Sequence, residues 1–192
     1  MTISAGIDYS MSSPAITIYN DTKPFHIDNC KIFYLTGHKK CLNKRADWLG
    51  TLLPKTESFK SVEERFDYIA QWALNAVQKN NVWKVFLEGY SFSSKGSSIF
   101  QIGENTGNLK NSLWRAGIPF DTIPPKSVKL SFSGNGNASK ILMEMKFLQE
   151  TGIDIKKLLD MTEKQENPSS DIIDSYAILK CGLEMNNECQ KS

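Results

Sequence analysis

The sequence predicts an α/β fold in which a central mixed five-stranded sheet is flanked by helices. Short apolar runs typical of strands occur between segments whose apolar residues repeat at helical spacing. Three strands come first, and strands and helices then alternate, an order that favours a mixed sheet with helices on its faces. The length suits one domain, residues 1–192, with no internal repeat or linker.

The first third of the chain predicts three strands followed by a long loop. Residues 3–8 form a short apolar run that ends in Asp8. Turn formers at 10–14 and β-branched or aromatic residues at 15–19 then predict a hairpin. A third strand is expected within residues 25–35, whereas the hydrophilic stretch 37–60 predicts a long loop or insertion.

Helices and buried strands make up the remainder. Ser61 and Glu64 form a capping box, which predicts the start of a helix. The run before Glu88 is apolar except for Lys84, as in an interior strand covered on both faces. The expected helices are 61–80, 98–116, 126–132, 138–150 and 168–185, and the expected strands are 82–87 and 118–123.

Composition excludes several classes of protein. A hydrophobic content of 40% and a charged content of 23% argue against disorder. No run approaches the roughly 18 apolar residues of a membrane span, and the start of the chain lacks the basic residues of a signal peptide. The four cysteines form no CxxC pair, so we expect reduced thiols, no zinc site and a cytoplasmic protein.

Charge is unevenly distributed along the chain. Residues 91–147 hold seven Lys or Arg against three Asp or Glu, whereas residues 148–192 hold five Lys against nine acids. A basic middle and an acidic end fit a nucleic-acid groove beside metal-binding acids. Charge alone still favours an ordinary mixed surface.

Four carboxylates are the candidate catalytic and metal-binding residues. Asp8 and Glu88 end two strands, and the carboxyl ends of neighbouring strands meet where ligands usually bind. Asp171 and Asp174 are three residues apart at the start of the last helix and therefore share a face. Each acid alone has an ordinary structural interpretation. Together they favour bound Mg²⁺, which prefers carboxylates, and two such ions roughly 3.5–4 Å apart hydrolyse phosphodiesters.

Four motifs follow one another along the chain: Gly6-Ile-Asp8-Tyr-Ser10, Phe86-Leu-Glu88-Gly-Tyr90, Pro125-Lys-Ser-Val-Lys129 with Gly134-Asn-Gly-Asn-Ala138-Ser-Lys140, and Asn167-Pro168-Ser-Ser-Asp171-Ile-Ile-Asp174-Ser-Tyr-Ala177. In this order, from about residue 3 to 182, they resemble the motifs of RuvC-like Holliday junction resolvases, members of the RNase H-like nuclease superfamily. The resemblance implies an RNase H-like fold with the four acids as catalytic and metal-binding residues.

The resemblance also implies the activity and the partners. We expect a structure-selective endonuclease that nicks four-way and other branched DNA with two Mg²⁺ ions per site, for which Mn²⁺ would substitute. Two symmetric nicks require two active sites and hence a homodimer, with the helices at 61–79 and 98–116 as candidate interfaces.

Basic and aromatic residues are the candidate DNA-binding groups: Tyr90, Phe92, Lys95, Lys126, Lys129 and Lys140. Lysines neutralise phosphates, and the resemblance gives Lys129 and Lys140 a DNA contact near the metals. The alternative for the lysines is a solvated surface turn. An aromatic side chain after Glu88 would stack on a base or pack in the core. The basic loop at 39–45 is more typical of a solvated loop, and the two histidines show no partner spacing.

Departures from the family pattern favour a bacteriophage-type member, acting in the host cytoplasm. Residues 36–60 look long for a bacterial protein, Ser175 stands where the family usually has Ala, and residues 103–110 differ in detail. Three alternatives remain: a flap or RNA–DNA hybrid nuclease with the same acids, a non-catalytic junction-binding protein, and an actin-like ATPase, for which the chain is too short.

Overall fold

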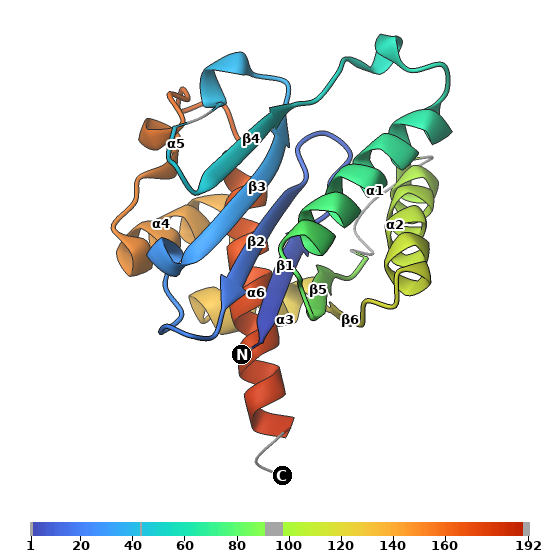
Figure 1. Ribbon diagram of the computed structural model, residues 1–192. Helices are drawn as coiled ribbons and strands as arrows, with labels where there is room; N and C mark the ends of the chain where they lie inside the picture. The colour runs from blue at the N-terminus through green and yellow to red at the C-terminus, as the bar shows by residue number, and fades with distance from the viewer. Residues whose placement is uncertain (1, 43, 91–97, 190–192) are drawn as a thin grey trace.

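The computed structural model describes residues 2–42, 44–90 and 98–189, and in these a mixed sheet separates two layers of helices (Figure 1). Its strands are β1 (Ile3–Asp8), β2 (Ala15–Asn20), β3 (Cys30–Thr36), β4 (Trp48–Leu52), β5 (Lys84–Glu88) and β6 (Phe120–Ile123). The helices are α1 (Val62–Lys79), α2 (Ser98–Arg115), α3 (Pro125–Ser133), α4 (Lys140–Thr151), α5 (Ile155–Leu158) and α6 (Ser169–Cys189). Short 3-10 helices are η1 (Ile27–Asn29), η2 (Lys39–Cys41) and η3 (Thr56–Ser58).

The sheet has six strands in the order β4-β3-β2-β1-β5-β6, which corrects the prediction of five. The additional strand, β4, lies in the stretch predicted to be a loop and pairs in parallel with β3 at the sheet edge. Only Trp48 of its five residues is buried. An edge strand with one buried side chain lacks the alternation by which sequence reveals strands, which explains why the prediction missed it.

The two faces of the sheet have separate cores. Side chains of α1 and α2, such as Ala73 and Leu109, pack with Ile7 and Val85 on one face. The opposite face is covered by α3, α4 and α6, with Phe147 and Ile173 among its buried residues. In Figure 1, α6 passes behind the strands while α1 lies in front of them. None of the described helices is long and apolar enough to cross a membrane.

The predicted capping box at the start of α1 is confirmed with one change. The Ser61 hydroxyl accepts a hydrogen bond from the backbone N–H of Glu64 at 3.3 Å. The Glu64 carboxylate reaches back to the N–H of Lys60 instead of that of Ser61. The cap therefore also ties the end of the preceding loop to the first turn of α1.

Two glycines set how closely α6 lies on the sheet. A Cβ at Gly6 of β1 would lie 2.4 Å from the carbonyl oxygen of Ser175 and 2.5 Å from the amide nitrogen of Leu179. A Cβ at Gly182 of α6 would lie 2.3 Å from the ring of Phe86 in β5. Since neither position has room for a methyl group, glycine is required for the backbone of α6 to approach β1 and β5.

Candidate active site

The sheet places two of the four candidate carboxylates side by side. Strands β1 and β5 are parallel neighbours, and Ile7 pairs with Leu87 in their register. Asp8 and Glu88 follow these partners directly, so both end their strands at the same edge of the sheet. Both side chains are partly buried.

The start of α6 brings the other two acids to the same edge. Asp171 lies in the first turn and is 5% exposed, and Asp174 follows one turn later. A buried hydrogen bond of 2.8 Å joins the hydroxyls of Thr17 in β2 and Ser175 in α6. Ser175 also donates to the carbonyl oxygen of Ile172 at 2.8 Å, so Thr17 is the donor in the first bond. This contact and the Gly6 contact fix α6 across β1 and β2.

The four acids lie close enough for their charges to act on one another. Burial raises the pKa of Asp8 well above its usual range, and the charges of Asp171, Asp174 and Glu88 raise it further. Burial, with the charges of Glu88 and Asp171, raises the pKa of Asp174 to about 7. The pKa of Glu88 is also raised by burial, against the opposing charge of Lys129. Like charges held together out of water favour protons or cations between them.

Asp171 is held by several hydrogen bonds. The Ser13 hydroxyl donates to its Oδ2 at 2.6 Å, and the hydroxyl of Ser10 and the carboxyl of Asp8 hydrogen-bond to it as well. Burial raises the pKa of Asp171 and these bonds oppose the rise. In the described ranges, no three His, Cys, Asp or Glu side chains are arranged so that they could hold a metal ion.

Two of the predicted basic residues lie near the acids. The charges of Lys129 in α3 and Lys140 in α4 both oppose the rise in the pKa of Asp174. Lys140 is also paired with Glu166, its Nζ lying 2.7 Å from Oε2. That contact raises the pKa of Lys140 and lowers that of Glu166. Lys126 is exposed on α3, beside the backbone of the glycine loop at 134–136.

A hollow of about 360 Å³ opens next to Asp8 and Glu88. It lies between the turn after β1, the end of β5 and helix α2, and Tyr90 is part of its lining. Tyr90 is 44% exposed, so it does not pack in the core. The Lys110 Nζ lies 4.9 Å from the centre of its ring. The other two predicted groups of this loop, Phe92 and Lys95, lie outside the described residues.

The structure thus brings all four predicted acids together, and Lys129 and Lys140 with them. Sequence reasoning missed Ser13 and Glu166, which contact Asp171 and Lys140. The serines at 10–13 were visible in the sequence only as turn formers, and nothing in the spacing showed which carboxylate they meet. The four carboxylates supply oxygen donors, the ligand type that Mg²⁺ prefers, although no three of the described side chains are placed to hold an ion.

The raised pKa of Asp174 predicts how the metal-free protein responds to pH. Because the folded-state pKa, about 7, exceeds the ordinary value of 3.8, the folded state binds more protons than the unfolded state between these values. This group therefore lowers the free energy of unfolding as pH rises from about 4 to 7. Asp174→Asn should raise the melting temperature in EDTA at pH 8 by at least about 2–4 °C, the equivalent of about 1 kcal/mol. The gain should shrink toward pH 4.

Melting curves from pH 4 to pH 8 check this, with the exposed Asp47→Asn as the matched control. A rise in melting temperature that is equal at every pH, or that also occurs in the control, would show that the charge of Asp174 does not destabilise the folded protein.

Solved structures of Holliday junction resolvases share this fold. Thermus thermophilus RuvC aligns with a TM-score of 0.61 and 18% identity, over 97% of this chain and 96% of that chain. T. thermophilus RuvC in complex with Holliday junction substrate aligns with a TM-score of 0.65 and 15% identity, over 98% and 96%. The yeast mitochondrial Holliday junction resolvase Ydc2 gives 0.55 and 13% identity, over 98% and 83%. No family model and no curated protein matches the sequence.

The chain therefore has the fold of the RuvC-type resolvases, an α/β sheet with helices on both faces. The likeness extends over nearly the whole chain, and the predicted fold class is confirmed with six strands in place of five. At these identities the likeness establishes the fold alone.

Proposed function

We propose that the protein is a metal-dependent, structure-selective endonuclease that nicks four-way and other branched DNA junctions. The observation that carries the proposal is the convergence of Asp8, Glu88, Asp171 and Asp174 at one sheet edge. Burial raises the pKa of all four acids, and repulsion by the other acids raises the pKa of Asp8 and Asp174 further. The solved structures that share the fold are of Holliday junction resolvases, one of them with its junction substrate.

The donor set fits Mg²⁺, with Mn²⁺ as a substitute. Four carboxylates offer hard oxygen ligands, and their repulsion is relieved only by protons or cations. Two bound ions would supply an activated water and stabilise the leaving oxygen of a phosphodiester. Asp8, Glu88, Asp171 and Asp174 would hold them. Because no three of the described side chains are placed to hold a metal ion, cation binding would reorient these carboxylates.

The lysines and Tyr90 would position the DNA. Lys129 and Lys140 lie where they oppose the negative charge of the acids, and each would neutralise a phosphate next to the scissile bond. A phosphate that binds Lys140 takes the place of the Glu166 carboxylate. Tyr90 lines the hollow beside the acids, where a half-exposed ring can stack on an unpaired base. Lys126 is exposed in the first turn of α3 and would contact the DNA backbone.

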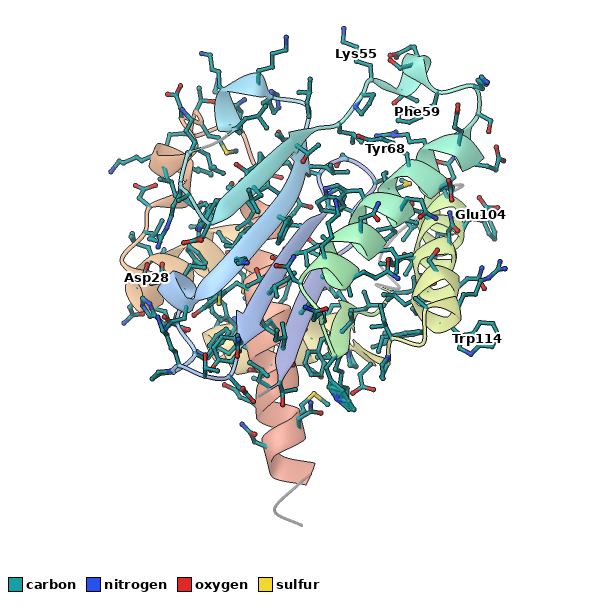
Figure 2. The ribbon with its side chains drawn as sticks, in the orientation of Figure 1. Asp28, Lys55, Phe59, Tyr68, Glu104 and Trp114 are labelled. Atoms are coloured by element: carbon teal, nitrogen blue, oxygen red, sulfur yellow. The ribbon has the colours of Figure 1, made fainter. Side chains whose placement is uncertain are left out.

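We propose that the active form is a homodimer, because two symmetric nicks require two active sites. Helix α2 presents Phe100 and Trp114, which are 73% and 74% exposed. Figure 2 shows Trp114 pointing away from the molecule at the outer side of α2. Large exposed apolar side chains on one helix favour a protein contact. Sedimentation equilibrium would show twice the chain mass, and a monomer at active concentrations would contradict the dimer.

We also propose that the protein is a bacteriophage-type member that acts in the host cytoplasm, because residues 36–60 form a long segment and Ser175 stands where the family usually has Ala. Strand β4 lies within this segment, residues 36–60.

A substrate panel tests the proposed activity. The wild-type protein with Mg²⁺ is given a synthetic four-way junction, a flap, a linear duplex of the same sequence and an RNA–DNA hybrid, with EDTA as the metal-free control. We expect paired nicks in the junction, much slower cutting of the linear duplex, and no cutting in EDTA. Preferential cutting of the flap or the hybrid would establish the other nuclease class. Junction binding without any cutting would establish a non-catalytic binding protein.

A further inference from the structure

The turn between β1 and β2 directly follows Asp8 and contacts the start of α6. Ser13 of this turn is 3% exposed, and its hydroxyl donates to Asp171 Oδ2 at 2.6 Å. The backbone N–H of Ser13 donates to the Ser10 hydroxyl at 3.0 Å, which closes the turn. Ser10 also lowers the pKa of the Asp171 carboxyl by hydrogen bonding, so both serines of the turn act on this group. The orientation of this carboxylate is therefore set by the turn.

Helix α1 holds the other side of the same turn. Arg65 Nη2 donates to the carbonyl oxygen of Met11 at 2.8 Å, and Nη1 donates to the hydroxyl of Thr56 at 3.1 Å. The Arg65 Nε is buried without a hydrogen-bond partner among the described residues. The guanidinium group thus links the turn to α1 and to the loop before α1.

That loop is itself fixed on α1. The rings of Phe59 and Tyr68 lie 5.6 Å apart, and Figure 2 shows both at the end of α1 that is nearest the loop. Arg65 therefore extends from the part of α1 that packs against this loop. Its contact with Met11 can restrain the turn that carries Ser13.

A serine that only stabilised its own turn would bond to nearby backbone, as Ser133 does with the carbonyl oxygen of Lys129 at 2.7 Å. Ser13 instead donates its hydroxyl to a carboxylate 158 residues away in the sequence. Hydrogen bonds to a ligating carboxylate orient it, and removing such a bond typically lowers metal affinity or activity about 10–100-fold.

We propose that Ser13 and Arg65 are positioning residues for Asp171. Ser13 sets the orientation of the carboxylate, and Arg65 holds the turn that presents Ser13. The inference rests on the proposed function, in which Asp171 is a ligand of a divalent cation. Arg65 acts through Ser13, so the two side chains form one mechanical path from α1 to the start of α6.

Mn²⁺ affinity of the DNA-free protein, measured by calorimetry, tests the path without relying on cleavage. We expect Ser13→Ala to weaken Mn²⁺ binding about tenfold or more, and Ser13→Thr to restore it because the hydroxyl is kept. Ser131→Ala is the matched control, since Ser131 also donates to a carboxylate at 2.6 Å, that of the exposed Glu184. This control should bind Mn²⁺ like the wild type.

The double variant tests whether Arg65 acts through Ser13. Arg65→Met should weaken Mn²⁺ binding in the same direction, and adding it to Ser13→Ala should cause little further loss, because residues on one path are not additive. Fully additive losses would overturn the role of Arg65. If Ser13→Ala does not fold, Arg65→Met decides: wild-type Mn²⁺ affinity in Arg65→Met would refute the path.

The same measurements distinguish a failure of the positioning role from a failure of the proposed nuclease function. A wild-type protein that binds Mn²⁺ and cuts junctions, with Ser13→Ala unchanged in affinity, overturns the positioning role alone. A wild-type protein that neither binds Mn²⁺ nor cuts DNA overturns the proposed function, and the positioning role with it.

Discussion

Asp8→Asn is expected to reduce Mg²⁺-dependent cleavage of a four-way junction by at least about a thousandfold, at the upper end of the loss from removing one fixed electrostatic group. The charges of Asp171, Asp174 and Glu88 all act on the carboxyl group of Asp8. An amide of the same shape keeps the packing but cannot carry the charge that holds a cation. The single-turnover cleavage rate of a labelled junction measures the loss.

Junction binding should survive the change. Since the substitution removes a negative charge, affinity measured in EDTA should be equal to that of the wild type or higher. Asp47→Asn, on an exposed residue, is the matched control and should cleave normally. Full activity of Asp8→Asn would reject the active-site assignment, and a parallel loss of binding would indicate general damage to the fold.

Gly6→Ala is expected to have the largest effect on stability. The new methyl group would lie 2.4 Å from Ser175 O, 2.5 Å from Leu179 N and 2.7 Å from Leu179 Cβ. Overpacking a core costs about 1–3 kcal/mol when side chains can adjust. Here two of the three nearest atoms belong to the backbone of α6, so we expect the free energy of unfolding to fall by at least about 3 kcal/mol.

Urea unfolding measures this change, and Gly107→Ala is its matched control. Gly107 lies within α2, and a methyl group there would meet no neighbouring side chain of the described residues within 4 Å. Replacing it should stabilise the helix by about 0.5–1 kcal/mol. Because α6 carries Asp171 and Asp174, any Gly6→Ala protein that folds should also bind Mn²⁺ more weakly. Unchanged stability would show that α6 is not held against β1 at this point.

The sequence was informative where function depends on the ends of regular elements. Asp8 and Glu88 follow apolar strand runs, and Asp171 and Asp174 share a helix face, so local patterns predicted where each would lie. The structure adds the register of β1 against β5, which places the first two acids side by side. It also adds the glycine contacts that bring α6 to them.

Other features depend on contacts that leave no local pattern. Strand β4 is an exposed edge with one buried residue, so its sequence has no alternation. Ser13 contacts Asp171 from the opposite end of the chain. Glu166, in the segment after α5, contacts Lys140 at the start of α4. A side chain's partner in such contacts is determined by tertiary packing, and spacing along the chain carries no information about it.

The central claim is that these four carboxylates bind the catalytic cations, and anomalous diffraction from Mn²⁺ tests it most directly. Crystals of the protein with a four-way junction would be soaked in Mn²⁺ and compared with crystals of Asp8→Asn. We predict two anomalous peaks about 3.5–4 Å apart, in contact with Asp8, Glu88, Asp171 and Asp174, and the loss of at least one peak in the variant. Manganese bound elsewhere, with these four side chains free of metal, would contradict the account.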